Sequence, residues 1–233
     1  MELIAILVLS LTIVVVSVFL MEFNLKNIKM IKQLGEKKDL NNITNGLPEN
    51  EQICKEMLKM LHNEEVKVKT GNSNSQASLY IIATNSILIA NIKNTFTRVQ
   101  TIAHECIHSI QDKRLQWFNF VFSNIYLIYF GIITIIALFN KLPYTNIFAI
   151  ILVMMSILYY FVRSYLETDA MIKARYLAKE YMDQNRELID EENIDIVVKN
   201  YDKLNAIGVK FYNMKIMYDC LSKVIIFCLV AII

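Results

Sequence analysis

Apolar residues in this chain gather in long uncharged blocks instead of recurring at the spacing of a soluble core. Residues 3–21, 115–140 and 142–162 contain no charged side chain. As helices that rise about 1.5 Å per residue, all three blocks are long enough to cross a hydrocarbon core of about 30 Å. The pattern therefore predicts three membrane spans, of which the last two form a helical hairpin with its turn at Asn140-Lys141-Leu142-Pro143.

The two ends of the chain need separate interpretation. Only Glu2 precedes the first block and no small-x-small cleavage site follows it, so we expect a retained anchor rather than a cleaved signal peptide. The last block, residues 224–233, has only ten uncharged residues, which is too short to span unless residues 217–223 also enter the membrane. Asp219 and Lys223 would then pair at the interface, and a fourth crossing stays an open alternative.

The polar segments have the periods of short helices and strands, which predicts a small body of mixed α and β structure. The predicted elements are a helix continuing the anchor over 23–40, a break at 41–50, an amphipathic helix at 51–62, a strand at 66–69, a polar loop at 70–76, a β-hairpin of 79–82 and 86–90 joined at 84–85, a helix at about 96–113 capped by Asn94 or Thr95, and an amphipathic helix at 183–215.

Composition excludes several classes of protein and charge predicts an orientation. With 55% hydrophobic residues, five glycines and two prolines, the chain is neither disordered, nor collagen-like, nor a small disulfide scaffold. A net charge of +2 gives no reason to expect nucleic acid as a partner. Of 24 Lys and Arg residues, 22 fall in residues 22–114 and 163–219, so the positive-inside rule places both segments in the cytoplasm and the N-terminus outside. Because two crossings separate these segments, they share one side of the membrane.

These patterns predict a mainly α, multi-pass protein of the cell membrane, with transmembrane helices and a small α+β cytoplasmic domain that contains a short β-hairpin. The predicted regions are an N-terminal transmembrane anchor at 1–21, a cytoplasmic region at 22–114, a transmembrane hairpin at 115–162, a cytoplasmic helical region at 163–219 and an apolar C-terminal helix at 220–233.

The predicted helix at 96–113 carries His104-Glu105-Cys106-Ile107-His108, an HExxH pattern. Because a helix turns about 100° per residue, His104 and His108 lie one turn apart on one face, where two imidazoles can bind one zinc ion. Glu105 then lies beside the metal and can accept a proton from its bound water. The alternative is a pair of helix-face histidines with ordinary hydrogen bonds.

A catalytic zinc ion needs a third protein ligand and one open position for water. His62 ends an amphipathic helix among polar residues, which favours a solvated role. The four cysteines lack CxxC spacing, so they are predicted to be free thiols, with Cys106 facing away from the histidines. Among the acids, Glu167 lies four residues beyond Arg163 at the exit of the third block, and His108 lies seven residues before the second. Because two crossings separate them, both are expected near one membrane face. The alternative for Glu167 is a solvated helix residue paired with a lysine or arginine.

At these positions the chain resembles a family. The segment Ile102-Ala-His-Glu-Cys-Ile-His-Ser-Ile-Gln111 resembles the AHE-x-GH-A-I-Q core of the YugP-like neutral zinc metallopeptidases, which are membrane-embedded proteins of gluzincin type. Downstream, Leu166-Glu167-Thr-Asp169-Ala170-Met-Ile-Lys173-Ala174 resembles the family's E-x-D/N-A-S-x-R-A segment. The order of elements is similar as well. The departures from the family pattern are Ile107 for glycine, Ser109 for alanine and Met171 for serine.

The resemblance implies a zincin-like cytoplasmic domain in which His104, His108 and Glu167 hold Zn²⁺. Glu105 would take a proton from the water and hand it to the leaving amine. In zincin folds a substrate typically pairs with the edge strand before the active helix, here residues 86–90.

Four further residues near the third ligand have two interpretations each. Asp169 lies about 200° around the helix from Glu167, so it is not expected to bind the same metal. We expect it either to hydrogen-bond a ligating histidine or the backbone, or to be a surface charge. Tyr165, Arg175 and Tyr176 are candidate donors to an oxyanion, or else packing and interface residues.

The predicted function is that of a membrane-bound zinc metalloendopeptidase that hydrolyses peptides or membrane proteins near the cytoplasmic face of the lipid bilayer. One alternative is a non-catalytic membrane module with a structural metal site. A transporter or channel component is disfavoured because no acidic, lysine, arginine or histidine side chain lies in the first three blocks. The sequence predicts no oligomeric state.

Overall fold

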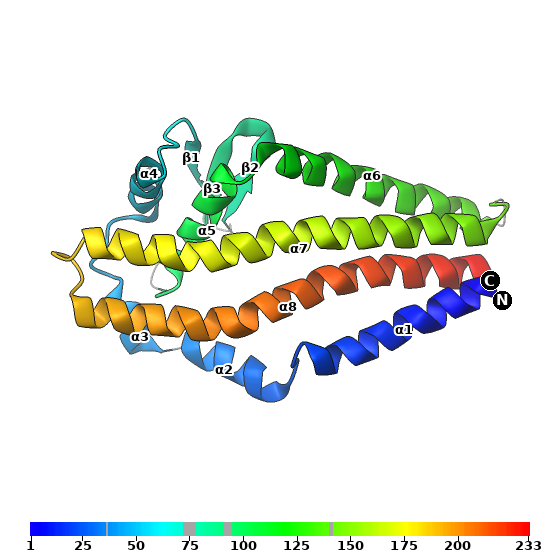
Figure 1. Ribbon diagram of the computed structural model, residues 1–233, viewed down its shortest axis with the longest axis horizontal. Coiled ribbons are helices and arrows are strands. Elements are labelled where there is room, and N and C mark those ends of the chain that lie inside the picture. The colour runs from blue at the N-terminus through cyan, green and yellow to red at the C-terminus, as the bar shows by residue number, and fades with distance from the viewer. Residues whose placement is uncertain (36, 72–77, 91–94, 140–141) are drawn as a thin grey trace. The chain divides into compact units, whose positions relative to one another are not determined.

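A computed structural model describes residues 1–233 except 36, 72–77, 91–94 and 140–141. The chain is mainly helical with one small sheet, as predicted (Figure 1). Its elements are α1 (Glu2–Leu20), α2 (Leu25–Gly35), α3 (Lys38–Ile43), α4 (Asn50–Met60), β1 (Lys67–Thr70), β2 (Leu79–Ile81), the 3-10 turn η1 (Ile82–Thr84), β3 (Ser86–Ile89), α5 (Arg98–Ile110), α6 (Lys113–Leu138), α7 (Thr145–Gln184) and α8 (Glu191–Ile232).

The chain forms two compact units, and the long helices α7 and α8 contribute to both. Unit 1 comprises Met1–Asn24, Arg114–Tyr165 and Lys210–Ile233, and unit 2 comprises Leu25–Lys113 and Leu166–Val209.

Unit 1 is built from helices whose outer surfaces are apolar. In the part of the chain that the structure describes, α1, α6 and α7 are long and apolar enough to cross a membrane. The hairpin of α6 and α7 is held by the Tyr126 hydroxyl, 2.7 Å from the Ser156 hydroxyl, and by Tyr129, which donates to the Phe148 carbonyl. The first two residues of the predicted turn, Asn140 and Lys141, lie outside the described residues.

The C-terminal half of α8 belongs to the interior of unit 1. Val224, Phe227 and Cys228 are buried in the same cluster as residues of α6 and α7. Tyr218 of α8 accepts a hydrogen bond from Ser17 of α1. The apolar C-terminal block therefore packs as a fourth helix among the three apolar ones.

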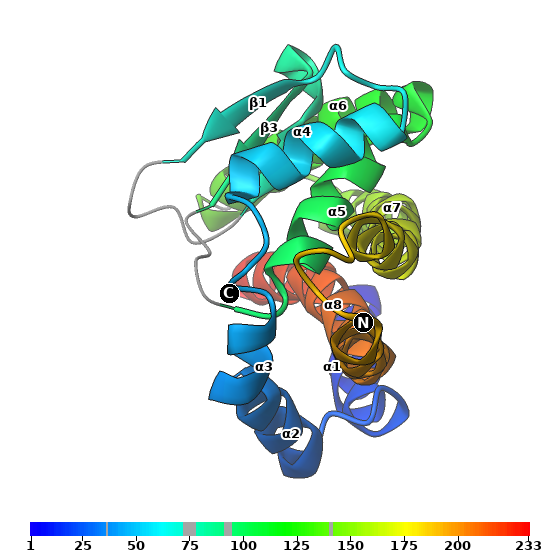
Figure 2. The same cartoon turned by 90° about the vertical axis from the view of Figure 1, so that its left-hand side faces the viewer.

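Unit 2 contains a three-stranded sheet in the order β1-β3-β2, against which α4 and α5 pack (Figure 2). The predicted hairpin is confirmed, since β2 and β3 are antiparallel with Tyr80 opposite Ile87. Asn85 closes the turn with a φ of 43°, in the left-handed region that asparagine tolerates.

One strand prediction is wrong. We expected residues 86–90 to form the sheet edge, but β3 is the central strand because β1 adds to it in parallel. Parallel pairing joins segments that no short turn connects, so strand patterns alone did not reveal it. The edge strands are β1 and β2.

Three helix predictions also need correction. The anchor helix does not continue over residues 23–40, because α1 ends at Leu20, Glu22 has a φ of 54°, and α2 and α3 follow separately. The helix at 96–113 is divided at Gln111, which is extended, and its N-cap is Thr97, whereas Asn94 lies outside the described residues. The helix at 183–215 starts too early, because α7 continues to Gln184 and α8 begins at Glu191. Part of the predicted loop at 70–76 also lies outside the described residues.

Candidate metal centre

Helix α5 presents its two histidines on one face and fully buried apolar residues on the other. Val99, Ile102 and Cys106 are fully buried on the other side. The Cys106 sulfur lies 3.7 Å from that of Cys54 on α4. This hydrogen bond and burial raise the pKa of the Cys106 thiol well above its ordinary value. Cys106 therefore faces away from the histidines, as predicted, and all four cysteines are free.

Helix α7 carries Glu167 into the interior of unit 2. The buried residues of this stretch recur at helical spacing, and three of them are alanines, which allow close packing. Glu167 is 4% exposed and is the one charged residue in this stripe among the described residues. The stripe consists of Leu166, Glu167, Ala170, Ala174, Leu177, Ala178, Tyr181 and Met182.

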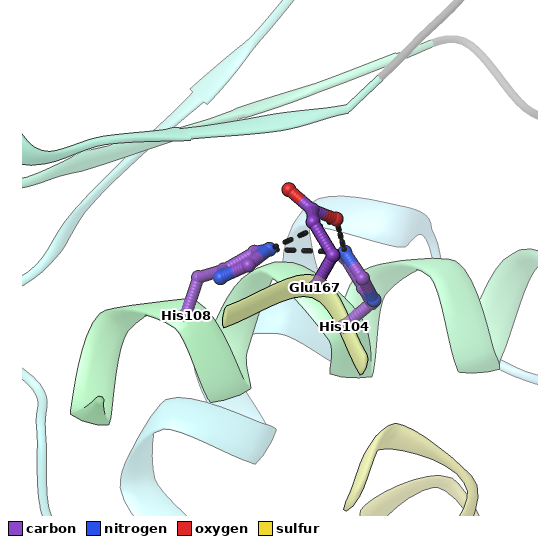
Figure 3. A group of neighbouring side chains, drawn as sticks. All are labelled: His104, His108 and Glu167. Carbon is purple, nitrogen blue, oxygen red and sulfur yellow. Dashed lines mark hydrogen bonds and ion pairs between the residues drawn. The ribbon is translucent and has the colours of Figure 1, made fainter. Parts of the chain in front are cut away.

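His104, His108 and Glu167 converge on one point (Figure 3). The Nε2 atoms of His104 and His108 are 3.0 Å apart. Glu167 Oε2 lies 3.3 Å from His104 Nε2 and 3.7 Å from His108 Nε2. Ligands at about 2.1 Å from a tetrahedral zinc ion are about 3.4 Å from one another. The observed separations bracket this value, so the three side chains fit a metal ion of this size.

Charge and burial act in opposite directions on His108. Burial lowers the pKa of the imidazole, but the hydrogen bond and charge of Glu167, together with the charge of Glu105, outweigh it. The pKa of His108 is therefore raised above its ordinary value. The site attracts positive charge, as a cation site must.

Glu105 is buried beside this cluster and contacts the sheet. Its Oε2 accepts a hydrogen bond from the backbone N–H of Tyr80 at 2.6 Å. Because this N–H points toward α5 and not toward β3, the outer edge of β2 faces the motif helix. Sequence patterns gave no signal for this contact, since the two residues are 25 positions apart.

Gln111 joins the two ligand-bearing helices and was also missed as a functional residue. Its Oε1 lies 2.8 Å from His108 Nδ1. Its Nε2 donates to the Leu166 carbonyl at 2.8 Å and to Asp169 at 2.9 Å. Gln111 is the last residue of the segment Ile102–Gln111 that resembles the family core, and this position was the available signal. Nothing in the sequence predicted its hydrogen-bond partners.

Asp169 has both of its expected roles. It accepts from Gln111 behind His108, and it pairs with Lys173 at 2.7 Å on the surface. Burial raises the pKa of Asp169, but the hydrogen bonds from Lys173 and Gln111 outweigh it, so the pKa lies below its ordinary value. Asp169 therefore stays an anion.

The remaining candidates are not members of the cluster. His62 is exposed just beyond α4. Arg175 makes two hydrogen bonds to Asp202 and stacks on Tyr176, which is largely exposed. Tyr165 is exposed and belongs to unit 1.

Comparisons with protein-family models, with curated proteins and with solved structures identify no match to this chain.

Proposed function

We propose that this protein is a membrane-bound zinc metallopeptidase that hydrolyses peptide bonds near the cytoplasmic face of the membrane. The observation that carries the proposal is the convergence of both HExxH histidines with a buried glutamate from a helix about 60 residues further along. We also propose, from the motif resemblance, that the chain is a YugP-like peptidase of gluzincin type with a zincin-like domain.

The donor set favours a catalytic over a structural metal. Structural zinc sites are closed by four protein ligands, often cysteines, whereas catalytic sites have three and leave one position open. Among the described residues the cluster has three members, with two imidazoles and one carboxylate. When bound, zinc supplies a Lewis acid that polarises a peptide carbonyl and makes water more acidic.

Glu105 supplies the acid–base chemistry. Its carboxylate accepts a proton from the attacking water and then donates it to the departing amine, and the second proton of the water follows to the same nitrogen, so that water and a peptide yield a carboxylate and an ammonium group. In the free protein the Tyr80 N–H holds the carboxylate. The outer edge of β2 is the proposed site for an extended substrate peptide, which would take over this N–H and so release Glu105 beside its own backbone.

The location near a membrane rests on sequence and helix composition. In the sequence, His108 lies five residues before α6, and Glu167 is on the same helix as the third candidate span. The cation bias assigns both segments to the cytoplasm. Suitable substrates are therefore ends or juxtamembrane loops of membrane proteins, and small peptides.

Cleavage of a peptide library by protein reconstituted in lipid vesicles tests the proposal. We expect cleavage that chelator abolishes and zinc restores. Glu105→Gln should lower the rate at least about 100-fold while zinc stays bound. Glu64→Gln, on an exposed acid after α4, is the matched control and should cleave like the wild type.

Two results would contradict the proposal. Equal cleavage by Glu105→Gln and wild type would remove the assigned base. Bound zinc without any cleavage would favour the alternative, a membrane module with a structural metal.

A further inference from the structure

Gln111 uses every polar atom of its side chain at the candidate metal centre, although it is not one of the ligands. It follows α5 directly, is 8% exposed, and has an extended backbone that ends the motif helix. The division between α5 and α6 thus turns this side chain toward His108 and α7.

The partners determine how the amide is oriented. On one side lie the Leu166 carbonyl and the Asp169 carboxylate, both of which only accept hydrogen bonds. The NH₂ group must therefore be on that side, and the amide oxygen faces His108. An amide oxygen can only accept, so His108 donates from Nδ1. With Nδ1 holding a proton, Nε2 is the nitrogen whose lone pair would bind a metal ion beside His104 and Glu167, once the ion replaces any proton there.

The same side chain links the two helices that carry the ligands. Leu166 precedes Glu167 by one residue and Asp169 follows it by two, so Gln111 contacts α7 on both sides of the third ligand. The Lys173 ammonium pairs with the other carboxylate oxygen of Asp169. A continuous path of hydrogen bonds thus runs from Asp169 through Gln111 to the ring of His108.

We infer that Gln111 is a positioning residue of the metal centre, which sets the tautomer and orientation of His108 and ties them to the Glu167 helix through Leu166 and Asp169. This inference rests on the proposed zinc site. Bonds of this kind behind a ligating histidine typically change metal affinity by about 10- to 100-fold.

The test is the zinc affinity of the full chain in mild detergent, measured by competition with a chromogenic chelator. Gln111→Met keeps the size of the side chain but removes its hydrogen bonds, and should weaken zinc binding by about 10- to 100-fold. Asp169→Ala should also weaken it, whereas Asp169→Asn, whose amide oxygen still accepts from Gln111, should stay within about twofold of wild type. Gln52→Met, on the surface of α4, is the matched control and should change nothing.

A double variant separates positioning from general damage. If Asp169 acts through Gln111, then Asp169→Ala should add less than about a twofold loss in the Gln111→Met background. Losses that multiply would overturn the relay. Thermal unfolding of the metal-free proteins reports whether each variant folds. Should Gln111→Met not fold, equal losses in Asp169→Ala and Asp169→Asn would overturn the inference, and a loss in the alanine variant alone would support it.

The inference and the proposed function fail in different ways. Wild-type zinc affinity in a folded Gln111→Met variant overturns the role of Gln111 and leaves the zinc site intact. Absence of zinc binding by the wild type overturns the proposed function, and this inference with it.

Discussion

Arg98 is a buried cation in the first turn of α5, and its replacement should loosen the attachment of the motif helix within unit 2. Its guanidinium donates to the carbonyls of Thr44, Leu47 and Pro48 and to the side chain of Asn50, at 2.6–2.9 Å. A cation at a helix N-terminus opposes the helix dipole, and burial lowers the pKa of Arg98. The four hydrogen bonds offset these costs.

The magnitude follows from the acceptors left behind. Arg98→Met keeps much of the packing but leaves three backbone carbonyls without this donor, at about 1 kcal/mol each. The expected loss of about 3 kcal/mol corresponds to a decrease in Tm of about 6–12 °C for a chain of this size. Arg98→Lys should fall between this variant and the wild type, because one ammonium cannot reproduce the planar fork.

The assay must report on unit 2 alone. Cys54 and Cys106 are both fully buried in unit 2, so a thiol reagent reaches them only when unit 2 unfolds. Their reaction is measured on heating in a Cys220→Ala/Cys228→Ala background, where no other thiol reacts. Arg175→Met removes an exposed pair with Asp202 and is the matched control, with an expected loss below about 1 kcal/mol. If Arg98→Met protects both thiols to the same temperature as the wild type, then the hydrogen bonds of Arg98 do not stabilise the attachment of α5.

Three further predictions concern the metal, the packing and the topology. Zinc at about 100 times its Kd should stabilise unit 2 by about 2.7 kcal/mol in the same thiol assay; an equal shift in His104→Ala would show that zinc binds elsewhere. Ala174→Leu, at a fully buried position of α7, should cost about 1–3 kcal/mol, whereas Ala206→Leu on the exposed side of α8 should be neutral, and equal effects would argue against the described packing. Val224 and Phe227 pack among the apolar helices, so we expect α8 to cross the membrane and end outside the cell. A single cysteine introduced by Ile233→Cys, in a chain without other cysteines, should therefore react with an impermeant reagent added to whole cells. Reaction only after lysis would place this end in the cytoplasm.

The parts of the fold that the sequence predicted well depend on local pattern. The uncharged blocks became α1, α6 and α7, and the β-branched runs became an antiparallel hairpin. The failures depend on contacts between distant segments. The parallel pairing of β1 made β3 central, and the continuous anchor helix failed because the chain turns at Glu22.

The candidate site divides in the same way. Helical spacing predicted that His104 and His108 lie together, and an even number of predicted crossings led us to expect Glu167 near them. No distance follows from spacing or from crossings, and the Tyr80 and Gln111 contacts arise only when the strand, the motif helix and α7 are packed. These hydrogen bonds join residues 25 and 55 positions apart, and no periodic pattern in the sequence predicts such pairs.

X-ray absorption of the zinc-loaded protein measures the ligand set most directly. We expect one zinc ion with two imidazole nitrogens at about 2.0–2.1 Å, with oxygen as the remaining ligands and no sulfur. In Glu167→Ala both imidazoles should persist at lower zinc affinity. A sulfur ligand at about 2.3 Å, or a spectrum unchanged by His104→Ala, would contradict the assignment of His104, His108 and Glu167 as the metal site.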